Sequence, residues 1–176
     1  MTQDATADRV LAAVRQRRDR VNAAIDEDLP MAEPERLYEA SRYILEAGGK
    51  RLRPTAALLV AEALAGVDAD ATTDYRSFPA LDGEPFDLMR TAVSVEVIQS
   101  FTLIHDDIMD DDDLRRGEPA VHRAYDTETA ILAGDTLYAK AFELLSDTGA
   151  DPANTVEAVN RLASACTRIC EGQSLD

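Results

Sequence analysis

Six aspartates fall within eight residues, at Asp106, Asp107 and positions 110–113. The first three have the spacing DDxxD at the expected end of a helix, where the helix dipole disfavours negative charge. So many carboxylates destabilise one another unless cations neutralise them, which argues against a merely solvated acidic helix end. An EF-hand loop does not fit, because counting from Asp106 places Asp111 where glycine is needed and Gly117 where glutamate is needed. The cluster therefore predicts a cation site, and a hard divalent ion such as Mg²⁺ suits carboxylate oxygens.

The segment that carries these aspartates has a polar stripe on an apolar background. As a helix it would place Gln99, Thr102, Asp106 and Asp110 within roughly 80° of arc. A polar stripe that ends in carboxylates fits the wall of a cavity better than a packed core.

Two clusters of basic residues would bind phosphate directly. Lys50, Arg51 and Arg53 lie at the expected start of a helix, where backbone N–H groups and the dipole also favour anions. Arg115 and Arg116 follow the aspartates, and the planar guanidinium suits bidentate phosphate contacts. Either cluster alone is typical of surface ion pairing with abundant acids. Together with the aspartates they predict two phosphate sites, one through a metal ion and one through side chains.

The elements that must position these residues are expected to be helices. Apolar residues at helical spacing, with proline and glycine at the breaks, predict helices over residues 7–28, 35–47, 53–66, 86–110, 127–145 and 152–176. Residues 67–86 predict a long acidic surface loop, and no strand pattern is found. The expected fold class is all-α, in a single domain over residues 1–176. The apolar stripe of the sixth helix still runs where the sequence stops, which indicates a domain truncated in that helix.

The composition of the 176 residues narrows the classes of function. There are 34 acidic against 18 basic residues, a net charge of −16, and repulsion by this charge argues against nucleic acids and anionic membrane surfaces as partners. Two lysines against sixteen arginines, with this acidity, favour a halophilic protein over an ordinary acidic cytosolic one. No signal peptide or transmembrane segment is found, so we expect a cytoplasmic protein. Cys166 and Cys170 are expected to be buried thiols rather than zinc ligands.

Several motifs in series resemble the trans-isoprenyl diphosphate synthase (polyprenyl synthetase) family. They are GGKRLRP at 48–54, LIHDDIMD at 103–110, RRG at 115–117, GDTL at 134–137 and GQSLD at 172–176. The resemblance spans about residue 35 to the end. It implies a helical bundle around a deep cavity, Mg²⁺ as cofactor and a homodimer. It also implies condensation of isopentenyl diphosphate with an allylic diphosphate, with geranylgeranyl diphosphate as the expected product and farnesyl or longer products open.

The resemblance also implies a role for individual residues. Asp106, Asp107 and Asp110 would be catalytic by binding Mg²⁺ at the allylic diphosphate, which Arg115 would contact. Isopentenyl diphosphate would be bound by a second set of residues: Gly49, Lys50, Arg53, Gln99 and Arg116. Gln173 resembles a later substrate-binding glutamine and Asp176 an additional metal-facing aspartate. Phe101, five residues before the first aspartate, would influence product length, although core packing is an equal alternative.

The family's second Asp-rich motif and a Lys-Thr pair are not found within the 176 residues. We therefore expect the chain to be the N-terminal part of the enzyme, to bury its apolar stripes poorly and not to turn over alone. Two other functions stay open: a non-catalytic helical subunit that pairs with a complete synthase, and a class I terpene cyclase or head-to-head synthase. The first-half ligand types argue against the former. The segment Gly-Lys-Arg-Leu-Arg-Pro argues against the latter, since a cyclase needs no isopentenyl site.

Overall fold

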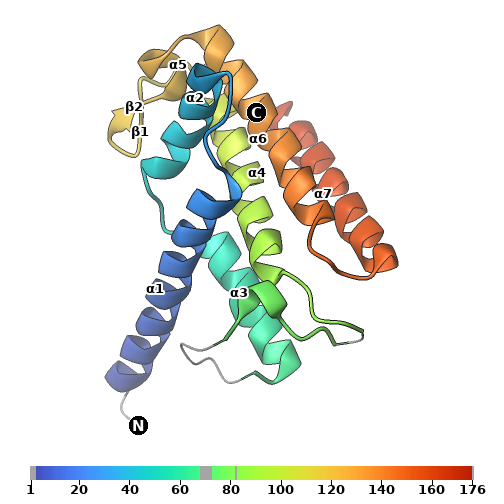
Figure 1. Ribbon diagram of the computed structural model, residues 1–176. Helices are drawn as coiled ribbons and strands as arrows, with labels where there is room; N and C mark the ends of the chain where they lie inside the picture. The colour runs from blue at the N-terminus through green and yellow to red at the C-terminus, as the bar shows by residue number, and fades with distance from the viewer. Residues whose placement is uncertain (1–2, 68–72, 82, 176) are drawn as a thin grey trace.

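The structure, a computed structural model, describes residues 3–67, 73–81 and 83–175, most of which form helices (Figure 1). The long helices are α1 (Gln3–Asp28), α2 (Glu35–Glu46), α3 (Leu52–Ala65), α4 (Leu88–Met109), α6 (Thr127–Ser146) and α7 (Pro152–Gln173). The shorter elements are the 3₁₀ turn η1 (Tyr75–Ser77), the strands β1 (Leu114–Arg115) and β2 (Glu118–Pro119), and helix α5 (Val121–Ala124). The all-α class and the six long helices are confirmed, with ends shifted by a few residues. The small hairpin and α5 were not predicted.

Helix α4 lies at the centre of the bundle, with α1, α2, α3 and α6 packed against it (Figure 1). Its side chains Ala92, Val93 and Val97 are completely buried. Helix α6 approaches it closely because alanines such as Ala141 face the contact, where the Ser94 hydroxyl donates to the Ala141 carbonyl at 2.7 Å. This packing explains why α4 is apolar on most of its circumference, and why polar residues on it need a separate explanation.

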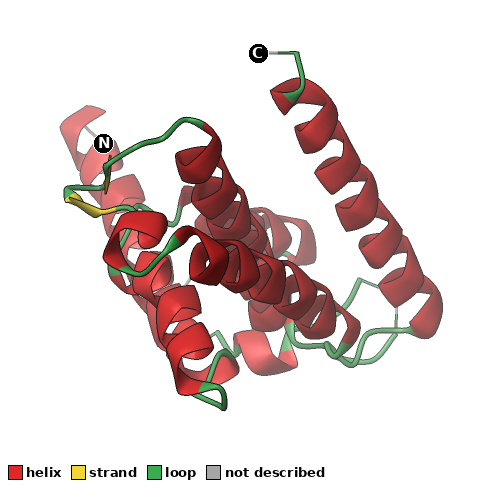
Figure 2. Ribbon diagram, turned by 90° about the horizontal axis from the view of Figure 1, so that it is seen from above, coloured by secondary structure: helices red, strands yellow, loops and turns green. Residues whose placement is uncertain are grey.

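Helix α7 packs on α6 and stands apart from the other helices (Figure 2). Within its described length, Cys166 is the buried residue, whereas Val156 and Ile169 are 60% and 43% exposed. On α6, Leu132 is 57% exposed. The expectation that the chain buries its apolar stripes poorly is therefore met by α7 and by this part of α6, but not by α4, whose apolar side chains are buried. Cys170 is exposed, so the expectation of two buried thiols is wrong for that residue. Among the described helices, none combines the length and apolar character needed to cross a bilayer.

The segment between α3 and α4 is not simply a surface loop. Tyr75 and Phe78 are 1% and 2% exposed, and the backbones of Phe78 and Phe86 pair through hydrogen bonds of 2.9 and 3.0 Å. The Tyr75 hydroxyl donates to Glu62 of α3, which also forms an ion pair with the buried Arg17 of α1 at 3.0 Å. The prediction of an acidic surface loop over residues 67–86 is corrected here, because two aromatic side chains anchor the segment in the core. Residues 68–72 and 82 lie outside the described part of the chain.

Replacing Tyr75 by phenylalanine is expected to destabilise the protein by about 1–3 kcal/mol, because the buried carboxylate of Glu62 loses a donor. Burial, and then the hydrogen bond to Glu62, raise the pKa of Tyr75 to about 12. Since the unfolded phenol ionises near pH 10, the folded state holds the proton more tightly between about pH 10 and 12. The stability that this phenol contributes is complete below pH 10 and is lost as the pH rises through that window.

Chemical denaturation at pH 8 and pH 11 measures this effect. The unmodified protein should lose stability between the two values, and Tyr75→Phe should lose less. Tyr38→Phe is the matched control and should follow the unmodified protein. An equal decline in Tyr75→Phe and the unmodified protein would show that the buried phenol is not the titrating group.

Candidate active site

A cavity of about 600 Å³ lies where the turn before α3 meets α4 and the β1–β2 hairpin. Its wall includes most of the residues predicted to bind substrate: Gly49, Lys50, Arg53, Gln99, Arg115 and Arg116. These residues come from three separate segments of the chain, so the fold brings the two basic clusters together. Arg115 is paired with carboxylates, whereas the described part of the chain gives Lys50, Arg53 and Arg116 no ion pair. The cavity therefore carries positive charge that an anion would neutralise.

Arg116 reaches the cavity because of the hairpin turn. Arg116 and Gly117 both have positive φ, 58° and 90°, as the two central residues of a type I′ hairpin turn do. The guanidinium lies against the backbone of Gly49, where an added Cβ would come within 2.7 Å of Nη1. Burial and repulsion by Arg51 lower the pKa of Arg116, with Glu96 opposing the change. Glycine at position 49 thus permits the approach of a cation that lacks a partner.

The protein itself neutralises four of the six clustered aspartates. The ion pairs are Arg115 with Asp107 and with Asp112 (3.3 Å), and Arg123 with Asp111 (2.7 Å) and with Asp113 (2.9 Å). In the described residues no cationic side chain pairs with Asp106 or Asp110, which lie one turn apart where α4 ends. Burial and repulsion by Asp110 raise the pKa of Asp106. A bound cation would relieve that repulsion.

Asp107 is separated from the other two aspartates of the motif. Its side chain is 1% exposed, and Oδ1 accepts a hydrogen bond from Nε of Arg115 at 2.7 Å. Oδ2 is buried and has no hydrogen-bond partner among the described residues. Asp107 lies about 100° around the helix from Asp106 and faces the interior, and its metal-binding role stays a prediction. The guanidinium of Arg115 is held by Asp107, and its contact with the allylic diphosphate stays a prediction.

The donor set of Asp106 and Asp110 fits a hard divalent cation that has few protein ligands. Within residues 3–67, 73–81 and 83–175, no three His, Cys, Asp or Glu side chains are grouped to hold a metal ion. A Mg²⁺ ion commonly takes one or two carboxylates and completes its shell with water and phosphate oxygens. Two aspartates one turn apart, beside a cavity for phosphate, therefore suit Mg²⁺ bound together with a diphosphate.

Two of the remaining predicted residues, Phe101 and Gln173, do not line this cavity. Phe101 packs between α4 and α6, with its ring centroid 4.7 Å from that of His105 and 5.1 Å from that of Tyr138. Gln173 is the last residue of α7 and does not contribute to the cavity wall. Asp176 lies outside the described residues. Product-length control by Phe101 and the roles of Gln173 and Asp176 stay predictions.

Two buried charges at the cavity were not recognised from the sequence. Arg51, one of the three basic residues predicted to bind phosphate, is instead 4% exposed and forms an ion pair with Glu96 of α4 at 2.6 Å. Glu96 lines the same cavity. The sequence did contain a signal for this buried ion pair, because Glu96 stands in an apolar stretch of the helix, three residues before Gln99.

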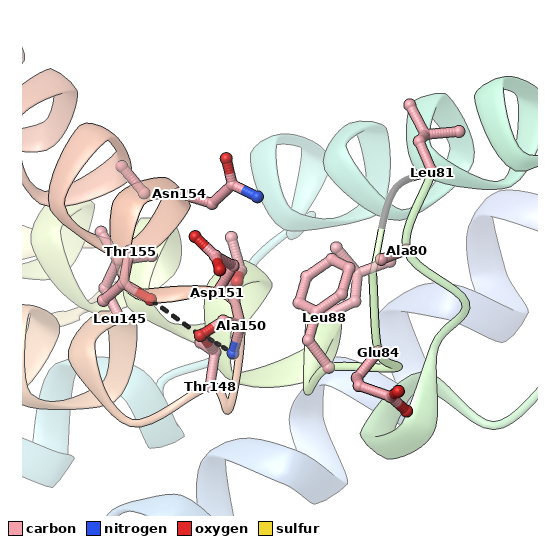
Figure 3. Close-up of a pocket in the computed structure, with 13 residues that line it drawn as sticks. Ala80, Leu81, Glu84, Leu88, Leu145, Thr148, Ala150, Asp151, Asn154 and Thr155 are labelled. Atoms are coloured by element: carbon pink, nitrogen blue, oxygen red, sulfur yellow. Dashed lines mark hydrogen bonds between the residues drawn. The ribbon is translucent and has the colours of Figure 1, made fainter.

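A second cavity, of about 440 Å³, lies at the opposite end of α4, between residues 80–91 and the start of α7 (Figure 3). Apolar side chains such as Leu81, Leu88 and Leu145 line it together with two acids, Glu84 and Asp151. None of its described lining residues is Lys or Arg. A diphosphate would be repelled there, so the cation-lined cavity is the candidate site.

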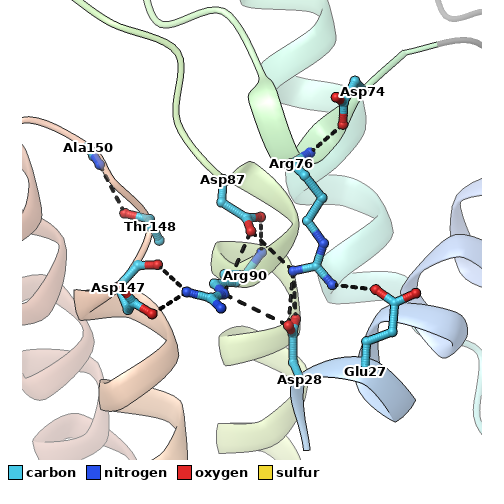
Figure 4. A network of polar contacts seen from close by, with 9 residues as sticks. All are labelled: Glu27, Asp28, Asp74, Arg76, Asp87, Arg90, Asp147, Thr148 and Ala150. Carbon is cyan, nitrogen blue, oxygen red and sulfur yellow. Dashed lines mark hydrogen bonds and ion pairs between the residues drawn. The ribbon is translucent and has the colours of Figure 1, made fainter.

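The basic residues near that second cavity are already paired (Figure 4). Arg76 contacts Asp28 at 2.9 Å and Asp87 at 3.1 Å, and Arg90 pairs with Asp147. Asp87 also caps α4, because its side chain accepts a hydrogen bond from the backbone N–H of Arg90 at 2.8 Å. This network fixes the beginning of α4, the helix whose other end carries Asp106, and leaves little charge for an anion.

Known proteins agree with this arrangement of fold and site. The pattern of the family described as Polyprenyl synthetase matches residues 34–176. The chain is 65% identical over 171 residues to a geranylfarnesyl diphosphate synthase of Natronomonas pharaonis, covering 97% of this chain and 50% of that protein. It is 49% identical over 163 residues to a geranylgeranyl diphosphate synthase of Methanosarcina mazei, covering 93% of this chain and 45% of that protein.

A solved structure gives the same result. The geranylgeranyl pyrophosphate synthetase from Geoglobus acetivorans superposes with a TM-score of 0.80 at 48% sequence identity, over 93% of this chain and 48% of that chain. The chain thus spans about half the length of the curated relatives it matches. Sequence, fold and the placement of the motifs lead to one assignment: the chain belongs to the polyprenyl synthetase family.

Proposed function

We propose that the intact protein is a Mg²⁺-dependent trans-prenyltransferase that condenses isopentenyl diphosphate with an allylic diphosphate. The observation that carries this proposal is the division of charge at the site. Among the described residues, Lys50, Arg53 and Arg116 are cations without carboxylate partners in one cavity. Asp106 and Asp110 are carboxylates without described cation partners at the end of the helix that lines it. One set suits direct binding of a diphosphate and the other suits binding through metal. Relatives named as prenyl diphosphate synthases support the same reaction class.

The proposed reaction breaks the C–O bond of the allylic diphosphate, forms a C–C bond to the double bond of isopentenyl diphosphate, and ends with loss of a proton. Asp106 and Asp110 would hold the metal, whose chemistry when bound is to neutralise the charge of the departing pyrophosphate. Lys50, Arg53 and Arg116 would orient isopentenyl diphosphate for attack. Apolar side chains next to the site, such as Leu103, would keep water from the allylic cation.

The proposed product is geranylgeranyl diphosphate. Phe101 lies on α4, five residues before Asp106. Its ring is held by contacts with the rings of His105 and Tyr138. A product one isoprene unit longer is the second candidate, since the relative with 65% identity is named a geranylfarnesyl diphosphate synthase. By the family resemblance we also propose a homodimer in the cytoplasm.

The test is to incubate the intact protein with isopentenyl diphosphate and an allylic diphosphate of five, ten or fifteen carbons, in low salt and in molar potassium chloride. We expect a longer prenyl diphosphate by mass spectrometry, formed only when both substrates and Mg²⁺ are present. A cyclic hydrocarbon formed from the allylic diphosphate alone would instead identify a cyclase. No product, together with a change in the activity of an added complete synthase, would identify a regulatory subunit.

A further inference from the structure

Arg51 is part of the wall of the cation-lined cavity, but all three nitrogens of its guanidinium are used for contacts within the protein. Nη1 donates to Glu96 at 2.6 Å, Nε donates to Asn22 at 2.9 Å and Nη2 donates to the Leu45 carbonyl at 2.5 Å. These three partners belong to α4, α1 and α2, so one side chain joins three helices. The backbone of Arg51 has φ 48°, in the left-handed region, immediately before α3 begins. Its side chain is 2% exposed and is not available to a substrate in the way that its neighbour Lys50 is.

Glu96 places a carboxylate at the same cavity. Its side chain is 5% exposed and lines the wall that also carries Arg116. A buried carboxylate next to a diphosphate would repel it strongly, because such repulsion is poorly screened away from water. The ion pair with Arg51 cancels this charge. The part of the cavity wall formed by Arg51 and Glu96 is thereby close to neutral, while Lys50, Arg53 and Arg116 keep a positive charge there.

We propose that Arg51 is a positioning residue of the isopentenyl diphosphate site, that it acts by neutralising the buried carboxylate of Glu96, and that neither side chain contacts the substrate. This inference rests on the proposed function. Asn22 and the Leu45 carbonyl also hold the guanidinium of Arg51, so its position does not depend on the charge of Glu96. Removing Arg51 therefore has a worse effect on diphosphate binding than removing Glu96, although the two residues form one ion pair.

Three variants of the intact protein test this asymmetry: Arg51→Gln, Glu96→Gln and the double variant. Arg51→Gln should raise KM for isopentenyl diphosphate about 10- to 100-fold, because an uncompensated carboxylate then faces the substrate. Glu96→Gln should leave this KM unchanged or lower it. The double variant should recover to within about threefold of Glu96→Gln, and KM for the allylic diphosphate should change less than about threefold in all variants. Thermal unfolding of each variant separates these effects from a loss of folded protein.

A direct substrate contact by Arg51 would leave the double variant as weak as Arg51→Gln, and that result would overturn the proposal. A purely structural role would raise both KM values together with the loss of thermal stability, which would also overturn it. If Arg51→Gln does not fold, the double variant decides: a KM near that of the unmodified protein supports the proposal, and an increase above about tenfold overturns it.

Binding of inorganic pyrophosphate, measured by titration calorimetry, distinguishes failure of this inference from failure of the proposed function. Weaker pyrophosphate binding in Arg51→Gln that recovers in the double variant would support the positioning pair even if no condensation is detected. Condensation activity without that recovery would refute the pair and leave the proposed function intact.

Discussion

Replacing Asp106 by alanine in the intact protein is expected to lower kcat roughly 10²- to 10⁴-fold, because the departing pyrophosphate would lose much of its charge stabilisation. Asp106 and Asp110 are the two members of the aspartate cluster that form no ion pair within the described part of the chain. The variant should also need more Mg²⁺ for half-maximal activity. KM for isopentenyl diphosphate should change little, because the cavity that holds the basic residues does not include Asp106. Steady-state kinetics over a range of Mg²⁺ concentrations measures all three quantities.

Asp113→Ala is the matched control for this variant. Asp113 belongs to the same run of aspartates, but its side chain is 83% exposed and is paired with Arg123 at 2.9 Å. Removing an exposed ion pair of this kind has little effect, so turnover close to that of the unmodified protein is expected. Near-normal turnover in Asp106→Ala would refute the metal assignment. An equally large loss in Asp113→Ala would show that the cluster does not divide as the ion pairs indicate.

The helices could be predicted because their signals are local. Apolar periodicity and the glycines and prolines at the breaks were enough to place α2 and α6 within one residue at each end. The segment before α4 could not be predicted in the same way. Its composition is that of a loop, and only the contact of Tyr75 with Glu62 on another helix makes its aromatic residues part of the core.

The sequence also could not predict which charged residues of the site are buried in ion pairs. The sequence identified which basic and acidic residues belong to it, and the fold brings most of the basic ones to one cavity. Helical spacing placed Asp107 on another face than Asp106, but it could not show that Arg115 pairs with Asp107. The sequence also could not distinguish Arg51 from Lys50, because that distinction depends on which side of the turn faces the interior. Once α4 and the turn before α3 are packed, Arg51 is buried in an ion pair with Glu96, whereas its neighbour Lys50 has no ion pair among the described residues. In the same way Asp107 is buried against Arg115, whereas its neighbour Asp106 is not paired with a described cation.

Replacing Lys50 by alanine is expected to raise KM for isopentenyl diphosphate about 10- to 100-fold, as the loss of one charge-assisted hydrogen bond to a phosphate does. Lys50 lies at the cavity wall, follows Gly49 in the turn before α3, and has no carboxylate partner among the described residues. KM for the allylic diphosphate and kcat at saturation should stay within about threefold, because the metal site lies on a different element. The effect should shrink in molar salt, since the side chain is exposed and its charge is screened.

The chain offers a direct control, because its other lysine lies elsewhere. Lys140 is on α6, where it pairs with Glu143 at 2.5 Å, and it does not line the cation-lined cavity. Lys140→Ala removes the same charge from the same acidic protein and should leave KM for isopentenyl diphosphate unchanged. If both variants raise KM equally, the effect arises from net charge and not from the cavity. If neither does, isopentenyl diphosphate binds at another place, and the unpaired cations at positions 50, 53 and 116 require a different anion.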